Sequence, residues 1–325
     1  MPRPPKPPPF DGIIVVNKPS GRTSHDVVES VRRIVGFRGI GHLGTLDPLA
    51  TGVLVLALGR ATRLARFYAG RRKRYSCAMR FGFETDTYDS DGEALGADSA
   101  PVLNAEEIAA HAMKFLGKIQ QVPPSYSAKK IHGRSAHQLA RKNKPVNLEP
   151  VEVEVFEFKL TGVEGSTARF DVECGAGTYI RSLAFDMGKL HGAGAHLSEI
   201  TRTAVGEFTL DQSVALGDLE HDAAKAGKLQ DHVIRLENVL ADLPRVTVLP
   251  IIERRIRHGA KFNLSLAQIQ PGSSILAQGA TSELDSGEWK PARLRVFNQQ
   301  GQLIAIAEPV VPRTYQPVLV LDAIP

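Results

Sequence analysis

The sequence predicts an α+β fold, in which a large domain with a mixed, mainly antiparallel sheet and flanking helices is followed by a small β-rich domain. Three observations predict it. Residues 75–81 alternate between apolar and polar side chains, as in a strand with one buried face, and residues 53–58 are apolar throughout, as in a fully buried strand. Segments with helical periodicity are interspersed among such strands, which is typical of α+β architectures.

The chain begins with six prolines in its first ten residues, so residues 1–10 are expected to form a disordered tail. Residues 13–16 then predict a short buried strand. Ser24 is the expected N-cap of a helix whose apolar side chains share one face and which ends at Gly36.

The middle of the chain predicts a second helix, which is capped by Asn104 and runs to about Leu116. A strand that begins at Val151 switches the phase of its apolar positions at Phe156, and this switch predicts a β-bulge. A further helix is expected over residues 180–190.

A break near Asp242 and Pro244 predicts a domain boundary, with a larger domain over residues 11–243 and a smaller one over residues 244–325. The elements expected in the smaller domain are a basic helix, a hairpin tip and a closing strand, over residues 253–258, 298–301 and 318–321.

The composition is that of a soluble globular protein, because 42% of the 325 residues are hydrophobic and 23% are charged. The sequence has no apolar run near the length of a membrane helix, and its start does not match a signal peptide. Cys77 and Cys174 stand apart without metal-ligand spacing, so we expect buried, reduced thiols, no metal site and a cytoplasmic location.

Basic residues are clustered, and the net charge is +5. This distribution favours a polyanionic partner such as RNA, whose phosphates would follow the clusters. The clusters are Arg71 to Arg74, Lys129 and Lys130 with Arg134, Arg141 and Lys142 with Lys144, and Arg254 and Arg255 with Arg257 and Lys261.

The most informative stretch is GHLGTLDPLATG, residues 41–52, a glycine-rich loop with the acid Asp47 at its centre. Pro48 biases Asp47 toward extended or turn conformations, and the apolar strand that follows offers a rigid support. Functional groups are often presented on such loops. Asp47 is therefore a candidate nucleophile or base, and the alternative is an Asp-Pro turn that merely starts a strand.

This loop and five other stretches occur in the order in which they are found in the TruB-type tRNA pseudouridine synthases. The chain resembles that family over residues 11–19, 41–54, 73–75, 85–93, 123–128 and 175–183. By its position, the C-terminal domain is similar to the PUA-like RNA-binding module that ends many of these enzymes.

The resemblance implies an enzyme that isomerises uridine-55 in the T-loop of tRNA to pseudouridine. The bond between ribose C1′ and uracil N1 is broken, the base rotates, and it is rejoined through C5. Asp47 would attack C1′ as a nucleophile or remove a ribose proton as a base. The resemblance implies no cofactor and no metal, the tRNA T stem-loop as partner, and a monomer.

The resemblance also suggests roles for five further residues. Arg181 would orient the catalytic carboxylate through its guanidinium group, and Tyr75 would stack on the target base. His42 would help to fill the space left by the extruded base. Lys18 would support the active-site loop, and Ile200 would form part of the apolar wall of the pocket.

Two features of the sequence need separate interpretation. His137 stands where the family often has a tyrosine, a difference that concerns RNA contact rather than catalysis. The acidic loop over residues 86–93 does not fit a calcium-binding EF-hand, because Thr87 would have to be the first ligand.

Two other functions are alternatives. An RNA-binding or RNA-folding protein without catalysis would share the basic surface and the C-terminal module, and a glycosylase that releases the base would share base flipping and an aspartate. A uridine in ribosomal RNA is an alternative substrate for the same chemistry. The presence of Asp47, Tyr75 and Arg181 favours the isomerase, because a pure RNA binder does not need a carboxylate beside the phosphate backbone.

Overall fold

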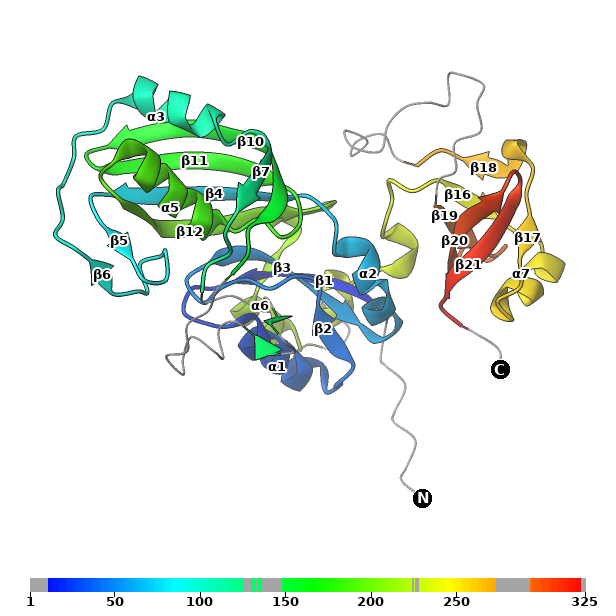
Figure 1. Cartoon of the computed structure of the whole chain (residues 1–325). Helices are drawn as coiled ribbons and strands as arrows, with labels where there is room; N and C mark the ends of the chain where they lie inside the picture. Colours follow the sequence, from blue (N-terminus) through cyan, green and yellow to red (C-terminus); the bar gives the residue numbers. More distant parts are fainter. Residues whose placement is uncertain are drawn as a thin grey trace.

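The computed structural model describes residues 11–125, 130–131, 134–135, 148–223, 225, 228–272 and 293–322. In this part of the chain, a large sheet runs in the order β14-β1-β3-β12-β4-β11-β10-β7, with β2, β13 and β15 paired to its members (Figure 1). Its strands are β1 (Gly12–Lys18), β2 (Ile40–His42), β3 (Thr51–Leu58), β4 (Lys73–Phe81), β7 (Gly117–Gln121), β10 (Val151–Glu164), β11 (Thr167–Cys174), β12 (Ala195–Val205), β13 (Phe208–Thr209), β14 (Val214–Ala215) and β15 (Ile234–Arg235).

The predicted fold class is confirmed, because the sheet is mixed and mainly antiparallel. Only the pairs β1 with β14 and β3 with β12 are parallel among its described ladders. The helices are α1 (Ser24–Val35), α2 (Ala65–Tyr68), α3 (Ala105–Met113), α5 (Ile180–His191), α6 (Leu216–Ala223) and α7 (Pro250–Arg257), with 3₁₀ turns η1 (Gly59–Leu64), η2 (Leu210–Gln212), η3 (Lys228–His232), η4 (Leu236–Asn238) and η5 (Leu266–Gln268). Two small hairpins pair β5 (Glu84–Thr85) with β6 (Ala94–Leu95) and β8 (Lys130–Ile131) with β9 (Arg134–Ser135).

Strands β1 and β3 are buried on both faces, which explains the unbroken apolar run in β3. One face, with Leu54 and Leu56, packs against α1 and α6, and the other, with Val53 and Val55, packs against η1 and α2. Helices α3 and α5 cover a separate core on β4, β10, β11 and β12. The free thiols of Cys77 and Cys174 are buried in this second core, as expected.

The cap of α1 differs from the prediction. Thr23, not Ser24, is the N-cap: its hydroxyl accepts from the Asp26 amide, and the Asp26 carboxylate accepts from the Thr23 amide at 2.9 Å. Ser24 is the first helical residue because its hydroxyl is engaged elsewhere, with the main chain of Leu46. Gly36 ends the helix in the left-handed conformation, as predicted.

Two predictions for the middle of the chain are confirmed. Strand β10 shifts its register between Val155 and Glu157, where the sequence predicts a bulge. Asn104 caps α3 by accepting from the Glu107 amide at 3.0 Å. The helix ends at Met113 rather than near Leu116, because the next residues form tight turns before β7 begins.

The C-terminal residues form a second sheet in the order β17-β21-β20-β19-β16-β18. Its strands are β16 (Arg245–Thr247), β17 (Phe262–Asn263), β18 (Ile269–Gln270), β19 (Leu294–Phe297), β20 (Leu303–Val311) and β21 (Thr314–Val320). The hairpin tip between β19 and β20 lies at Asn298 to Gly301. Helix α7 and strand β21 match the expected basic helix and closing strand, and each ends one residue earlier than expected.

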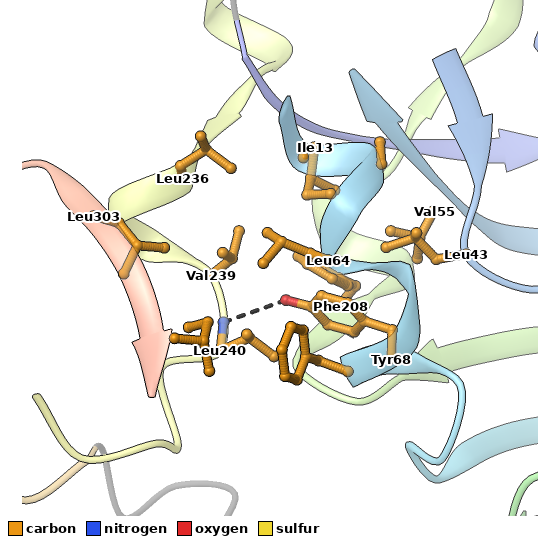
Figure 2. Close-up of a cluster of buried hydrophobic side chains, with 14 of the residues drawn as sticks. Ile13, Leu43, Val55, Leu64, Tyr68, Phe208, Leu236, Val239, Leu240 and Leu303 are labelled. Carbon is orange, nitrogen blue, oxygen red and sulfur yellow. Dashed lines mark hydrogen bonds between the residues drawn. The ribbon is translucent and has the colours of Figure 1, made fainter. Parts of the chain in front are cut away.

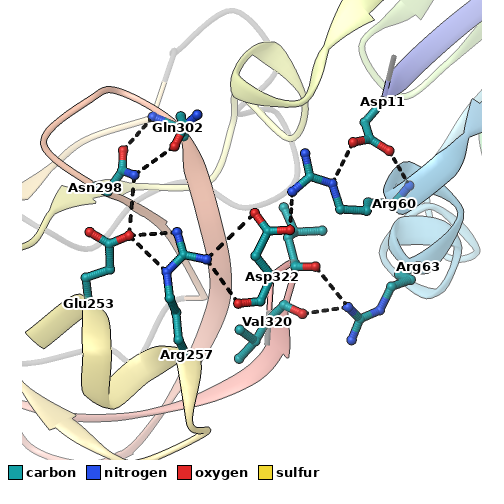
Figure 3. Close-up of polar contacts among 10 residues, drawn as sticks. Asp11, Arg60, Arg63, Glu253, Arg257, Asn298, Gln302, Val320 and Asp322 are labelled. Atoms are coloured by element: carbon teal, nitrogen blue, oxygen red, sulfur yellow. Dashed lines mark hydrogen bonds and ion pairs between the residues drawn. The ribbon is translucent and has the colours of Figure 1, made fainter. Parts of the chain in front are cut away.

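The second sheet packs directly against the first part of the chain. Figure 2 shows Leu303 of β20 in one apolar cluster with Leu64, Tyr68, Leu236, Val239 and Leu240. The Tyr68 hydroxyl accepts from the Leu240 amide at 3.2 Å. Figure 3 shows the polar part of this contact, in which Arg60 joins Asp11 to Asp322 and Arg63 donates to the Val320 carbonyl at 2.6 Å.

Candidate active site

A pocket of about 290 Å³ opens between the loop before β3, strands β4 and β12, and the start of α5. Four of the six predicted site residues line it: Asp47, Tyr75, Arg181 and Ile200. They come from four different elements, so the sheet pairings that place β12 between β3 and β4 bring them together.

Asp47 presents its carboxylate at the pocket. Its side chain is 45% exposed, although Leu46 before it and Ala50 after it are buried. The Ala50 amide donates to the Asp47 carbonyl at 3.1 Å, which closes a turn through Pro48. The loop thus fixes the main chain while it leaves the carboxylate open to a ligand.

Arg181 lies between two carboxylates. Its Nε is 3.0 Å from Asp47 Oδ2, and its Nη1 is 3.4 Å from Asp89 Oδ2. Nη1 also donates to the Thr87 carbonyl at 3.0 Å. Because Arg181 is almost fully buried, these contacts fix the direction of its guanidinium group, as the predicted orienting role requires.

Sequence reasoning did not identify Asp89 as a site residue. It is buried, and its Oδ1 accepts from the Thr87 hydroxyl at 2.6 Å and the Asp91 amide at 3.1 Å. The signal was the acidic loop itself, which offered several carboxylates and no way to tell which one faces Arg181.

Tyr75 and Ile200 form an apolar wall of the pocket. Each packs against both the α1/α6 core and the α3/α5 core, so they lie where the two halves of the sheet meet. Burial raises the pKa of Tyr75 to about 12, and the charge of Arg202 opposes that increase. Tyr75 therefore keeps its phenolic proton at neutral pH.

Lys18 lies beneath the loop instead of in the pocket. It is fully buried, and its Nζ donates to the carbonyls of Pro19 at 2.9 Å, Arg22 at 2.6 Å and Pro48 at 3.0 Å. Burial lowers the pKa of Lys18 to about 8, although the Asp47 carboxylate raises it.

His42 ends β2 and does not line the pocket. It is half-buried, and burial lowers the pKa of its imidazole. It precedes Asp47 in the chain and lies outside the pocket lining, so its role toward an extruded base stays a prediction.

Arg202 is a pocket residue that sequence reasoning missed. It is only 2% exposed and donates to three main-chain carbonyls: Val53 at 2.8 Å, Thr45 at 3.0 Å and Gly44 at 3.1 Å. The position of Arg202 in the sequence did not indicate that it is buried, because an arginine on a strand is normally exposed.

Several basic side chains of the predicted phosphate track are paired with acids. Arg71 bonds Asp242, and Arg72 and Arg74 both bond Glu173. Lys73 faces the pocket, and Arg254 and Arg255 are exposed on α7. His137 and the cluster at Arg141, Lys142 and Lys144 lie outside the described residues, as does the tail over residues 1–10.

None of the helices in the described part of the chain has the length and apolar character of a membrane span.

The chain is similar to known proteins in sequence and in fold. Residues 32–180 match the family model described as TruB family pseudouridylate synthase (N terminal domain), and residues 181–244 match the model for the tRNA pseudouridylate synthase B C-terminal domain. The chain is 43% identical over 312 residues to tRNA pseudouridine synthase B of Solibacter usitatus, covering 96% of this chain and 100% of that protein. It is 38% identical to the protein of the same name from Thermotoga maritima, covering 91% and 89% of the two chains.

Among solved structures, the chain is similar to one in a crystal structure of a Cbf5-Nop10-Gar1 complex. The TM-score is 0.71 with 24% identity, over 96% of this chain and 85% of the other. At that identity the similarity shows the fold alone.

Proposed function

Because this chain belongs to the TruB family of tRNA pseudouridine synthases, we propose that it isomerises uridine-55 in the T-loop of tRNA with Asp47 as the catalytic carboxylate. The enzyme is an isomerase that converts uridine to pseudouridine in tRNA. The observation that supports our assignment of Asp47 is its ion pair with Arg181 at the mouth of the pocket, 3.0 Å long.

The geometry suits a carboxylate that must be held in one direction. Arg181 holds one oxygen of Asp47, so the other can face a ribose. As a nucleophile, Asp47 would form a bond to C1′ while N1 of uracil leaves with the bonding electrons. As a base, it would take a ribose proton as the same bond breaks.

Tyr75 and Ile200 would hold the detached base while it rotates. Both are partly buried and line the pocket, so they offer flat and apolar surfaces to a uracil. Base stacking on an aromatic side chain contributes about 1–3 kcal/mol per base. Lys18 would act indirectly, through its bond to the Pro48 carbonyl next to Asp47. His42 would contact the RNA at the site of extrusion.

We further propose that residues 11–243 form the catalytic domain and residues 244–325 a PUA-like RNA-binding domain, preceded by a disordered tail over residues 1–10. The exposed Arg254 and Arg255 on α7 support an RNA contact in the second domain. The enzyme would act as a cytoplasmic monomer on the T stem-loop.

The test is tritium release from tRNA that carries C5-tritiated uridine. Wild type should release tritium, and Asp47→Asn should not, although it binds tRNA. The control is Asp98→Asn, which loses an ion pair with Arg80 far along the acidic segment and should react normally. Full activity in Asp47→Asn would refute the assignment. Tight binding of tRNA without tritium release by wild type would favour a non-catalytic RNA binder. Tritium release only from ribosomal RNA would identify ribosomal RNA, not tRNA, as the substrate.

A further inference from the structure

The main chain on both sides of Asp47 is held by buried polar side chains from three other segments. Arg202 binds the carbonyls of Gly44 and Thr45, and Lys18 binds the carbonyl of Pro48. Ser24 binds Leu46 twice, accepting from its amide at 2.8 Å and donating to its carbonyl at 2.9 Å. Four of the residues around Asp47 are thus fixed, while its own carboxylate remains free to act.

Ser24 completes both hydrogen-bonding groups of Leu46. The hydroxyl is buried, at 3% exposed, so water does not replace it easily if it is removed. It is also set apart from the neighbouring Thr23, whose hydroxyl caps α1 and makes no bond to the loop. Removing the Thr23 hydroxyl should therefore affect the cap of α1, whereas removing the Ser24 hydroxyl should affect the position of the loop.

Arg202 reaches the loop from below because β12 and β3 approach closely. The two strands pair in parallel, with Arg202 opposite Gly52, and a Cβ on Gly52 would lie 2.3 Å from the Arg202 carbonyl oxygen. Gly52 has φ of +94°, which a side chain rarely adopts. This contact places the guanidinium group directly under Gly44 and Thr45, where its planar fork can bond two successive carbonyls.

We propose that Arg202 and Ser24 are positioning residues, which set the reactivity of Asp47 by fixing the main chain that carries it. The proposal rests on the function proposed above for Asp47. Both act on the loop through its main chain, Arg202 at Gly44 and Thr45 and Ser24 at Leu46. Catalysis is sensitive to such positions, since a shift of about 1 Å can reduce a rate by about 100-fold.

The first test does not depend on activity. Hydrogen exchange at the Leu46 amide is measured in wild type, Ser24→Ala and Thr23→Ala. The amide should exchange at least about 10-fold faster in Ser24→Ala, because its acceptor is gone, and at the wild-type rate in Thr23→Ala. Wild-type exchange in Ser24→Ala would overturn the role of Ser24, whether or not the proposed function is correct.

The second test compares two buried arginines. Arg295 also donates to main-chain carbonyls, Val239 at 3.1 Å and Leu243 at 3.2 Å, but lies in the C-terminal sheet away from the pocket. In Arg202→Met, kcat should fall about 10- to 100-fold with little change in the Kd for tRNA. In Arg295→Met, stability should fall but kcat should not. Arg202→Lys should recover part of kcat, since an ammonium group can still bond one carbonyl.

Equal effects of Arg202→Met and Arg295→Met on kcat, or a change in Kd with kcat intact, would overturn the role of Arg202. If Arg202→Met does not fold, Ser24→Ala tests whether the loop position sets the reactivity of Asp47, because Ser24→Ala should reduce kcat more than Thr23→Ala does. If wild type itself lacks activity, the proposed function fails and the exchange experiment still tests the loop.

Discussion

Single residues at the candidate site divide into those that line the pocket and those that bond the main chain of the Asp47 loop, and Arg202 does both. Asp47, Tyr75, Ile200 and Arg202 line the pocket, whereas Lys18 is buried beneath the loop. The buried Lys18 and Arg202 donate hydrogen bonds to main-chain carbonyls, which carry no formal charge, so these bonds do not cancel the positive charge of either side chain. The site therefore places two positively charged side chains beneath the main chain of the Asp47 loop.

Lys18 gives a prediction for pH. Its pKa is about 8 in the folded protein and 10.5 in its ordinary state, so between these values the unfolded chain binds more protons than the folded chain. The stability of wild type relative to Lys18→Met should therefore rise as the pH increases from about 8 to 10.5, and be constant below pH 8.

Urea unfolding of both proteins at several pH values measures this difference. A relative stability that falls over the same interval would show that the folded protein holds the Lys18 proton more tightly than the unfolded chain, contrary to the burial seen here.

At the level of elements, the active-site loop depends on how two strands meet. Strand β3 carries the end of the loop and β12 carries Arg202 and Ile200, and the two pair at Gly52. The bulges of β12 after Leu197 and after Arg202 adjust which of its side chains point at the pocket.

Gly52→Ala should destabilise the fold by more than the strain of its φ alone, which is about 1–3 kcal/mol, because the new methyl would meet the Arg202 backbone. Gly165→Ala is the matched control: Gly165 also has positive φ, but a Cβ there meets nothing within 4 Å. Denaturant unfolding compares them. Equal losses of stability in Gly52→Ala and Gly165→Ala would mean that β3 and β12 make room for the new methyl group, contrary to the prediction.

For the whole molecule, the decisive feature is the shared core between the C-terminal sheet and the rest of the chain. Leu321, after β21, packs in the same cluster as Ile13 of β1, and the ion pair between Arg71 and Asp242 reinforces it. The two sheets are thus joined by apolar packing as well as by the polar contacts of Arg60 and Arg63.

Leu321→Ala should cost about 2–5 kcal/mol and lower the stability of both sheets together, because the cavity would lie in their common core. Val310→Ala, at an exposed position of β20, should change stability by less than about 0.5 kcal/mol. Hydrogen exchange followed in β3 and β20 measures the effect. Faster exchange in β20 alone would show that the sheets unfold independently.

The sequence by itself determined the family, through the order of its motifs. It also determined the fold class, the buried strand β3 and the loop position of Asp47, because glycines, proline and apolar runs act through local backbone preferences. Tertiary structure alone decided that Ser24 serves the loop rather than the helix cap, that Asp89 faces Arg181, and that Arg202 is buried. The physical reason is that these contacts join residues far apart in the chain, and a polar side chain's partner is set by packing rather than by its neighbours in sequence.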